Sequence, residues 1–150
     1  MLLTLVMALS VTTISWADGG NKAAEFNGQQ YDTLLAAVQA AVQENTTAGK
    51  TIKLLGDVTE DVADIEGLSN FMLTIDLNGR SYTGMIRKYH DLVVTDTSES
   101  KTGTAHFSYV MCNVLELQGG NIVIDDAVIY HATYLKGATV TINGGEYQYS

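Results

Sequence analysis

Apolar residues recur at alternate positions in several short segments of this chain. The clearest segments are residues 121–126 (NIVIDD) and 139–144 (TVTING), in which alternating aliphatic residues precede a turn. A period of two predicts β-strands that bury one face. Ile124 and Ile142 hold equivalent positions in the two segments, which therefore predict one strand–turn unit that occurs twice.

Similar units lie upstream. Residues 73–79 (LTIDLNG) and 92–96 (LVVTD) show the same alternation, with Ile75 and Val94 in equivalent positions. Leu54, in the segment TIKLL, is the expected equivalent of Ile75 in the unit before. Strand–turn units that recur roughly every 20 residues are typical of a solenoid, in which each coil buries one face against its neighbours. The pattern therefore predicts an all-β solenoid.

We expect the coils of this solenoid to occupy residues 46–150 and to be incomplete at the C-terminus. Tyr147 and Tyr149 alternate as though another strand begins, and no polar cap follows Gly145. The chain contains no proline. Proline cannot donate a hydrogen bond to a strand ladder, so its absence suits a continuous stack of strands.

Residues 25–45 are predicted to form an N-terminal cap. Asn27-Gly28 is a hairpin turn signal. Apolar residues after Asp32, its expected N-cap, lie on one face of a helix that ends near Glu44. These residues are Leu34, Leu35, Val38, Ala41 and Val42. Because a single amphipathic helix must bury its apolar face, we expect it to cover the open end of the first coil.

Residues 1–17 are predicted to be a secretory signal peptide. They are uncharged and apolar, and they end in Ser15-Trp16-Ala17, with small residues at both positions that signal peptidase requires. A short membrane anchor is the alternative, but the apolar run is shorter than the roughly 20 residues that span a bilayer. Residues 18–24 (DGGNKAA) are the expected linker. The predicted localisation is therefore secreted or at the cell surface.

Charge and cysteine content exclude some functions. The chain has 17 acidic and 8 basic residues, a net charge of −9. An acidic protein repels phosphate backbones, so we expect no nucleic-acid partner. Cys112 is the only cysteine, so no intrachain disulfide forms. It lies in an apolar segment and is predicted to be a core residue rather than a nucleophile.

Residues that could bind metals or cofactors do not form a recognisable motif. The acidic segment 57–66 is expected to be a solvated loop, with a calcium site as the alternative, although it matches no EF-hand. His90, His106 and His131 lack the spacing of a zinc site. Glycine pairs mark turns rather than a phosphate-binding loop. We therefore expect no metal and no cofactor.

The chain resembles the N-terminal portion of secreted bacterial right-handed parallel β-helix repeat proteins, which belong to the pectin-lyase-like superfamily. The resemblance covers about residues 26–147 and depends on segments such as 74–79 (TIDLNG) and 139–145 (TVTINGG). It implies a right-handed parallel β-helix. It also implies that turn asparagines, here Asn78 and Asn143, form side-chain ladders between coils.

The same resemblance bears on catalysis. Lyases of the superfamily carry an Arg-x-Pro-x-x-Arg motif, which a chain without proline cannot contain. Hydrolases of the superfamily combine an Asp-Asp pair with Gly-His-Gly and Arg-Ile-Lys, and this chain has only the pair, Asp125-Asp126. We expect these aspartates to form a turn, because consecutive strand residues point to opposite faces; a catalytic pair is the alternative. A Ser81–His90–Asp91 set is a weaker alternative. We therefore predict no catalytic residue.

Tyrosines are the candidate ligand-binding residues. Seven of them lie in the predicted coils, and an exposed ring on a rigid surface can stack against a sugar. The candidates for glycan stacking are Tyr82, Tyr130 and Tyr134. The alternative is that these rings cover the core at coil corners.

The predicted function is that of a non-catalytic module of a secreted or cell-surface bacterial protein, which acts as a stalk, in adhesion or in glycan contact. Its expected partner is a polysaccharide or a host or cell-surface glycan. One alternative is a truncated carbohydrate-active enzyme of the same fold, either a lyase or a hydrolase. The other is a solenoid that self-associates through the edge of its C-terminal coil.

Overall fold

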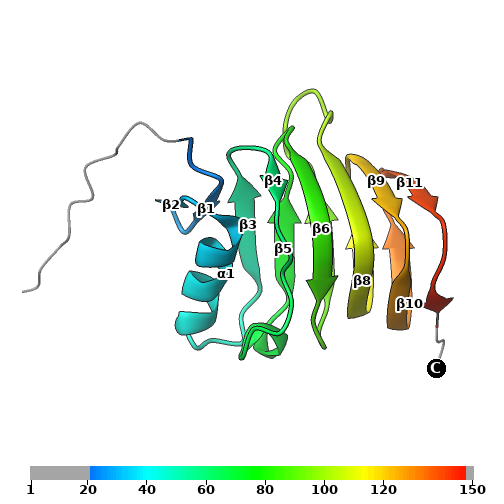
Figure 1. Ribbon diagram of the computed structural model, residues 1–150, viewed down its shortest axis with the longest axis horizontal. Coiled ribbons are helices and arrows are strands. Elements are labelled where there is room, and N and C mark those ends of the chain that lie inside the picture. The colour runs from blue at the N-terminus through cyan, green and yellow to red at the C-terminus, as the bar shows by residue number, and fades with distance from the viewer. Residues whose placement is uncertain (1–20, 148–150) are drawn as a thin grey trace, which may run out of the picture.

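Parallel strands stack coil upon coil to form a β-solenoid of about five turns, with one short helix near the N-terminus (Figure 1). This is the parallel β-helix that the strand repeat predicted. The computed structural model describes residues 21–147. The predicted signal peptide, residues 1–17, lies outside the described residues. The described part of the predicted linker 18–24 ends in Ala24, the first residue of strand β1.

Three parallel faces run along the solenoid. The first face contains β3 (Lys50–Leu54), β5 (Leu73–Asp76), β7 (Leu92–Thr95) and the C-terminal parts of β8 (Thr104–Leu117) and β10 (Ala127–Leu135). The second face contains β4 (Val58–Thr59), the start of β6 (Ser81–Arg87), the start of β8, β9 (Asn121–Ile124) and β11 (Thr139–Ile142). The third face contains the end of β6, the middle of β8, the start of β10 and β12 (Glu146–Tyr147).

Aliphatic side chains stack in columns inside the coils. One column on the first face follows the strand register from Ile52 to Ile75, Val94, Leu117 and Leu135. The first four of these side chains are completely buried. Burial of such a column contributes about 25 cal/mol for each Å² of apolar surface removed from water, so it stabilises the stack of coils.

The strand register corrects one predicted pairing. Ile75 pairs with Ile52 of the preceding coil, and not with Leu54. A shift of two residues leaves the same side chains pointing inward, so alternation in the sequence cannot distinguish the two registers. The predicted equivalences of Ile75 with Val94 and of Ile124 with Ile142 are confirmed, because each pair meets across neighbouring strands.

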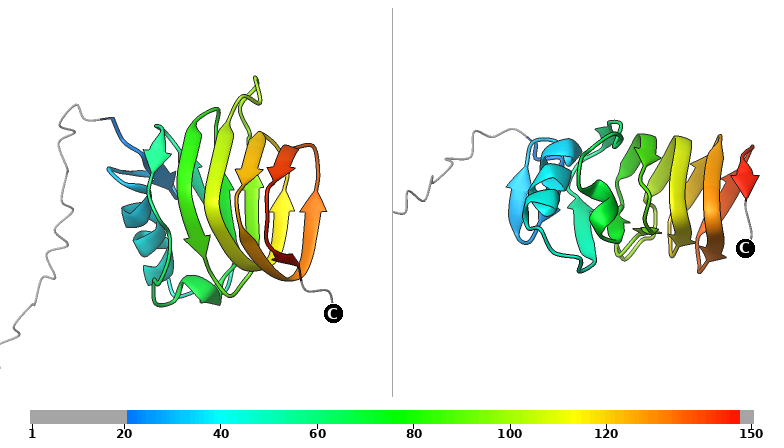
Figure 2. Two further views of the ribbon diagram at one scale, coloured as in Figure 1. Left: turned by 45° about the vertical axis from the view of Figure 1, so that its right-hand side comes forward. Right: turned by 90° about the horizontal axis from the view of Figure 1, so that it is seen from below.

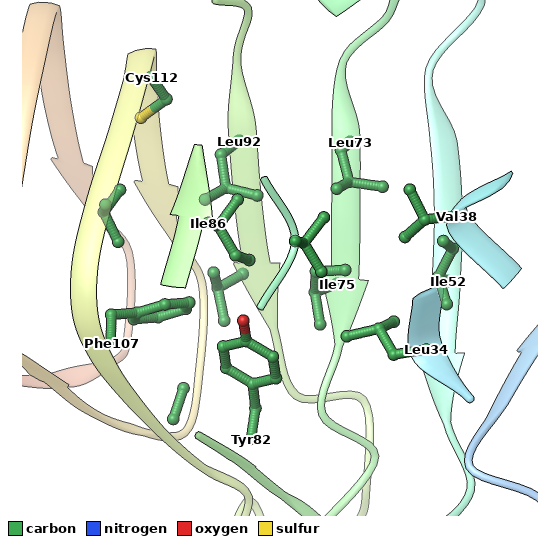
Figure 3. Packing of buried hydrophobic residues seen from close by; sticks show 14 of the residues in the cluster. Leu34, Val38, Ile52, Leu73, Ile75, Tyr82, Ile86, Leu92, Phe107 and Cys112 are labelled. Carbon is green, nitrogen blue, oxygen red and sulfur yellow. The ribbon is translucent and has the colours of Figure 1, made fainter. Parts of the chain in front are cut away.

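A hairpin and a helix cover the N-terminal end of the solenoid (Figure 2). Strands β1 (Ala24–Phe26) and β2 (Gln29–Tyr31) are antiparallel, as Asn27-Gly28 predicted, and β1 also pairs antiparallel with β3. Helix α1 (Leu34–Gln43) packs its buried side chains, including Leu34 and Val38, beside Ile52 of the first coil (Figure 3).

The N-cap of α1 is Thr33 rather than the expected Asp32. The Thr33 side chain accepts a hydrogen bond from the Ala36 N–H at 3.0 Å. The carboxylate of Asp32 instead pairs with the ammonium of Lys22 at 2.5 Å. Either side chain can cap a helix, so only the position at which the chain leaves β2 decides which residue does.

The acidic segment 57–66 is not simply solvated, as expected from its composition. The carboxylate of Asp57 accepts the N–H of Ser81 at 2.9 Å, and that of Asp61 accepts the N–H of Met85 at 2.8 Å. Strand β4 in this segment has only two residues. Side-chain oxygens therefore supply part of the hydrogen bonding that a longer strand would give to the next coil.

Hydrogen bonds of Asp76 and Asn78, rather than the implied asparagine ladder, join the coils at the corner between the first and second faces. The Asp76 carboxylate accepts the backbone N–H of Asn78 and the backbone N–H of Thr97, each at 3.0 Å. It also accepts the Thr97 hydroxyl at 2.6 Å. Asn78 donates to the Leu54 carbonyl, and Asn143 donates to the Asp125 carboxylate. Each asparagine therefore bonds a different partner, and neither stacks on another asparagine through these bonds.

A short 3₁₀ helix, η1 (Leu68–Asn70), leads into Phe71 at the corner before β5. Phe71 lies between two buried lysines, Lys50 at 4.8 Å and Lys88 at 5.9 Å from its ring centre. The buried thiol of Cys112 belongs to the core, as predicted. Burial raises its pKa to about 12, so it stays protonated and unreactive at neutral pH.

Candidate functional site

Tyr82 does not take part in a surface site. The structure places its ring in the core with 1% exposure, 5.2 Å from the ring of Phe107 (Figure 3). Its hydroxyl lies within hydrogen-bonding distance of the carbonyls of Glu60 (2.9 Å) and Met85 (3.1 Å). Burial also raises its pKa. The expectation that Tyr82 stacks on a glycan is therefore wrong, because the Tyr82 side chain points from the start of β6 into the core.

Tyr134 is half exposed on the first face, at the last described coil. The ammonium of Lys136 lies 5.8 Å from its ring centre and also pairs with Glu116 at 2.6 Å. This ion pair and a hydrogen bond from Gln118 lower the pKa of Glu116. The strand register places Tyr134 beside Glu116, so its surroundings are polar and charged.

Tyr130 forms the candidate site together with Tyr89, which was not among the sequence candidates. Their ring centres are 6.4 Å apart and their planes are inclined by 31°. Tyr89 is 61% exposed, whereas Tyr130 is half buried. Asn113 belongs to the coil between them and donates from its side chain to the Tyr89 carbonyl at 3.3 Å. We call Tyr89, Asn113 and Tyr130 the tyrosine platform.

The backbone beneath the platform is firmly held. The N–H of Tyr89 donates to the hydroxyl of Ser69 at 2.9 Å. The buried ammonium of the preceding Lys88 donates to the carbonyls of Phe71 and Asp91 at 2.8 and 2.9 Å. Tyr130 directs its hydroxyl toward the sulfur of Met111 at 3.7 Å. An aromatic ring on such an anchored backbone loses little conformational entropy when a ligand binds.

The outer side of the third face continues this surface. The register places Met85 beside Tyr109 and Arg87 beside Met111. Met111 in turn lies beside Val128 of the next coil, while the residues between these positions point into the core. Burial raises the pKa of Tyr109, which therefore remains a neutral phenol. The face thus combines aromatic, thioether and guanidinium groups, a composition enriched at binding surfaces.

A small pocket of about 80 Å³ adjoins Tyr89. Its lining residues are Asp64, Ile65, Ser69, Arg87 and Tyr89. The guanidinium of Arg87 and the carboxylate of Asp64 form an exposed ion pair at 3.1 Å. Planar charged groups next to an exposed ring can hydrogen-bond the hydroxyls of a ligand that stacks on that ring.

Asp125 and Asp126 stabilise their corner of the coil. The Asp125 carboxylate accepts a hydrogen bond from Asn143 at 2.9 Å and contacts the His106 ring nitrogen at 2.6 Å. These two hydrogen bonds lower the pKa of Asp125. The Asp126 carboxylate accepts the N–H of the next residue, Ala127, at 3.0 Å, at the start of β10. The hydrogen bonds therefore agree with the turn-forming role expected of this pair.

The other sequence alternatives do not form a site in the described part of the chain. His90 accepts the backbone N–H of Asp91 through its ring nitrogen at 2.7 Å, whereas the backbone N–H of Ser81 bonds Asp57. Among residues 21–147, no group of three or more histidine, cysteine, aspartate or glutamate side chains could hold a metal ion. No helix within these residues is long and apolar enough to cross a membrane.

Comparison with protein-family models, curated proteins and solved structures finds no match for this chain. Tyr89 could have been recognised from the sequence only with the coil register in hand, because Tyr89, Asn113 and Tyr130 are unevenly spaced along the chain.

Proposed function

We propose that this chain is a non-catalytic module of a secreted or cell-surface bacterial protein and that its tyrosine platform contacts glycans. The observation that supports this most directly is the exposed ring of Tyr89, held at 6.4 Å from Tyr130 on an anchored backbone. Aromatic rings with a polar hydroxyl suit ligands that are apolar on one face and polar at the edge, as sugar rings are.

The polar groups beside the ring support a glycan rather than a purely apolar ligand. Asp64, Ser69 and Arg87 surround the pocket next to Tyr89 and offer both hydrogen-bond donors and acceptors. A solenoid adds a long, rigid surface on which several sugar units of a polymer can lie. The same rigidity suits a stalk or an adhesive module.

Membership of the pectin-lyase-like superfamily and export from a bacterial cell are parts of this proposal. They are supported by the sequence resemblance and by the leader-like residues 1–17. Because one fold hosts many functions, support for glycan contact comes from the tyrosine platform rather than from the fold. The non-catalytic role is supported by the hydrogen bonds that commit Asp125 and Asp126 to their turn.

A glycan array followed by calorimetry with the best ligand tests this proposal. We expect Tyr89→Ala to weaken binding about tenfold, because an aromatic contact contributes about 1 kcal/mol beyond the area it buries. Tyr134→Ala is the matched control, since Tyr134 is also an exposed tyrosine but lies on another face. Equal losses in both variants would contradict the role of the tyrosine platform, and no binding to any glycan would contradict the glycan-contact role. Release of reducing ends or unsaturated uronates from a polysaccharide would contradict the non-catalytic role.

A second candidate function is self-association through the last described coil. Leu135 and Ile142 continue the buried columns of Leu117 and Ile124, yet they are 57% and 40% exposed. A second copy of the chain that docks on this coil would bury both side chains. Light scattering over a concentration series tests this candidate: a monomer at all concentrations, with no difference between the native chain and Leu135→Lys, would contradict it.

A further inference from the structure

A hollow of about 530 Å³ lies at the N-terminal end of the solenoid, away from the tyrosine platform. It is formed by the segment before β1, by β2, by the corner between β3 and β4, and by the turn before β6. Its lining residues are Asn21, Lys22, Gln30, Leu55, Gly56, Asp57 and Arg80. Four of these side chains carry N–H donors, and two of the four are cationic.

Cations are scarce in this protein, and nearly all have a partner. The chain has eight lysines and arginines, all within the described residues. Six of them make side-chain hydrogen bonds or ion pairs, namely Lys22, Lys50, Arg87, Lys88, Lys101 and Lys136. The guanidinium of Arg80 is exposed and makes neither within residues 21–147. An uncommitted arginine thus lines a hollow in a protein of net charge −9.

The turn that carries Arg80 is well defined. The backbone N–H of Arg80 donates to the Leu77 carbonyl at 2.8 Å, and the Arg80 carbonyl accepts the N–H of Thr104 at 3.0 Å. Asn78 and Gly79 before it have φ angles of 49° and 74°, which set a tight turn. The hydrogen bonds fix the point from which the side chain extends over the hollow, so binding would order only the side chain.

The opposite wall of the hollow is also fixed. Gly56 donates to the Ala23 carbonyl at 3.4 Å. A Cβ atom at Gly56 would lie 3.3 Å from the carbonyl oxygen of Lys22, so glycine lets the two segments approach closely. The ammonium of Lys22 pairs with the exposed carboxylate of Asp32. Exposed ion pairs are weak, so this ammonium can also interact with a ligand.

We propose that this hollow binds an oxyanion, the carboxylate or sulfate-ester group of an acidic ligand. The forked guanidinium of Arg80 would donate two parallel hydrogen bonds to the oxyanion, and Lys22 would add a second positive charge. The Asp57 carboxylate already accepts the Ser81 N–H and limits the total charge of the ligand that fits. The volume exceeds that of a bare ion, so the amides of Asn21 and Gln30 remain for the uncharged part of the ligand.

Titration of the isotope-labelled chain with inorganic sulfate and, separately, with acetate tests the proposal by NMR at constant ionic strength. We expect saturable shift changes at Lys22, Gly56 and Arg80. Saturation with sulfate alone assigns a sulfate ester, and saturation with acetate alone assigns a carboxylate. Long-range repulsion from an acidic protein opposes any non-specific binding of anions, so saturation requires a local site. The absence of saturable changes with both anions would overturn the proposal.

Charge variants separate a local site from a general charge effect. Arg80→Gln should weaken binding of the anion about tenfold. Arg80→Lys should weaken it less, because lysine keeps the positive charge but cannot donate two parallel hydrogen bonds as a guanidinium does. Lys136→Gln makes the same change in net charge at the other end of the solenoid and should leave binding unchanged. Equal weakening in Arg80→Gln and Lys136→Gln would overturn the proposal. These outcomes are independent of the tyrosine platform, which lies on another part of the surface.

Discussion

The side-chain carboxylate of Glu60 accepts hydrogen bonds from the backbone N–H groups of Leu34 and Leu35, at 3.1 and 2.9 Å. Leu34 is the first residue of α1, so a residue of the first coil binds the N-terminus of the helix that covers that coil. Helix N-termini expose unpaired N–H groups and carry partial positive charge. The contact therefore holds the cap on the solenoid electrostatically as well as by apolar packing.

Replacement of Glu60 by alanine should loosen this cap. The two N–H groups at the start of α1 would lose their acceptors, and we expect the free energy of unfolding to fall by about 1–2 kcal/mol. Urea denaturation followed by circular dichroism measures the change. Glu99→Ala, at an exposed position in the loop between β7 and β8, is the control and should change stability little. Equal losses in the two variants would contradict the role of Glu60.

Lys88 should make the free energy of unfolding vary with pH in the alkaline range. Burial lowers the pKa of its ammonium from 10.5 to about 8. Above pH 8 the folded state therefore loses a proton that the unfolded state retains until about 10.5, so stability rises with pH in this window. The thiol of Cys112, whose pKa is raised from 9.0 to about 12, acts in the opposite direction above pH 9.

The clearest effect of Lys88 is therefore expected between pH 8 and 9, where the free energy of unfolding should rise by about 1 kcal/mol. Urea denaturation at closely spaced pH values measures it. Lys88→Met removes the titrating group and should abolish this rise. It should also lower stability overall, because the carbonyls of Phe71 and Asp91 lose their donor. A rise of the same size in Lys88→Met would assign the effect to another group.

Asp96 should stabilise the corner between the first and second faces. Burial acts to raise its pKa, but hydrogen bonds from Ser98, Gly103 and Gly79 outweigh this effect and lower it. A lowered carboxyl pKa means that the stabilisation is present above the ordinary value of 3.8 and is lost as pH falls through the lower, folded-state value.

Asp96→Asn replaces one acceptor oxygen by an N–H donor, which then faces other donors. We expect a loss of about 2 kcal/mol in the free energy of unfolding at neutral pH. Thermal and urea denaturation measure it. Asp32→Asn is the control, because within residues 21–147 the Asp32 side chain makes only an exposed ion pair and its replacement should change stability by less than about 1 kcal/mol. No difference between the two variants would show that the hydrogen bonds of Asp96 contribute little.

Substitution of two glycines, Gly28 and Gly84, would distinguish the cost of an unfavourable φ angle from the cost of a steric clash. Gly28 and Gly84 both have positive φ angles, 78° and 152°. A Cβ atom at Gly28 would contact nothing within 4 Å, whereas one at Gly84 would lie 2.1 Å from the Glu60 carbonyl oxygen. Gly28→Ala should therefore cost only about 1–2 kcal/mol of conformational strain. Gly84→Ala should cost clearly more, because the first and second coils must move apart. Comparison of their urea midpoints measures the difference, and similar midpoints would contradict the close approach at Gly84.

The sequence by itself determined the class of fold and most of its elements. The alternation in residues 73–79, 92–96, 121–126 and 139–144 predicted parallel coils, Asn27-Gly28 predicted the hairpin, and the apolar spacing after Asp32 predicted the helix. These signals are local, because strand and helix periods follow from backbone geometry within a few residues. The core position of Cys112 followed from its apolar neighbours in the same way.

The tertiary structure decided what depends on contacts between coils. It paired Ile75 with Ile52 rather than Leu54, buried Tyr82 and placed Tyr89 next to Tyr130. Inward alternation is identical for registers that differ by two residues, and corners of uneven length change which side chains meet. The candidate sites are built from residues of different coils. The residues of each site therefore come together only when the coils have stacked.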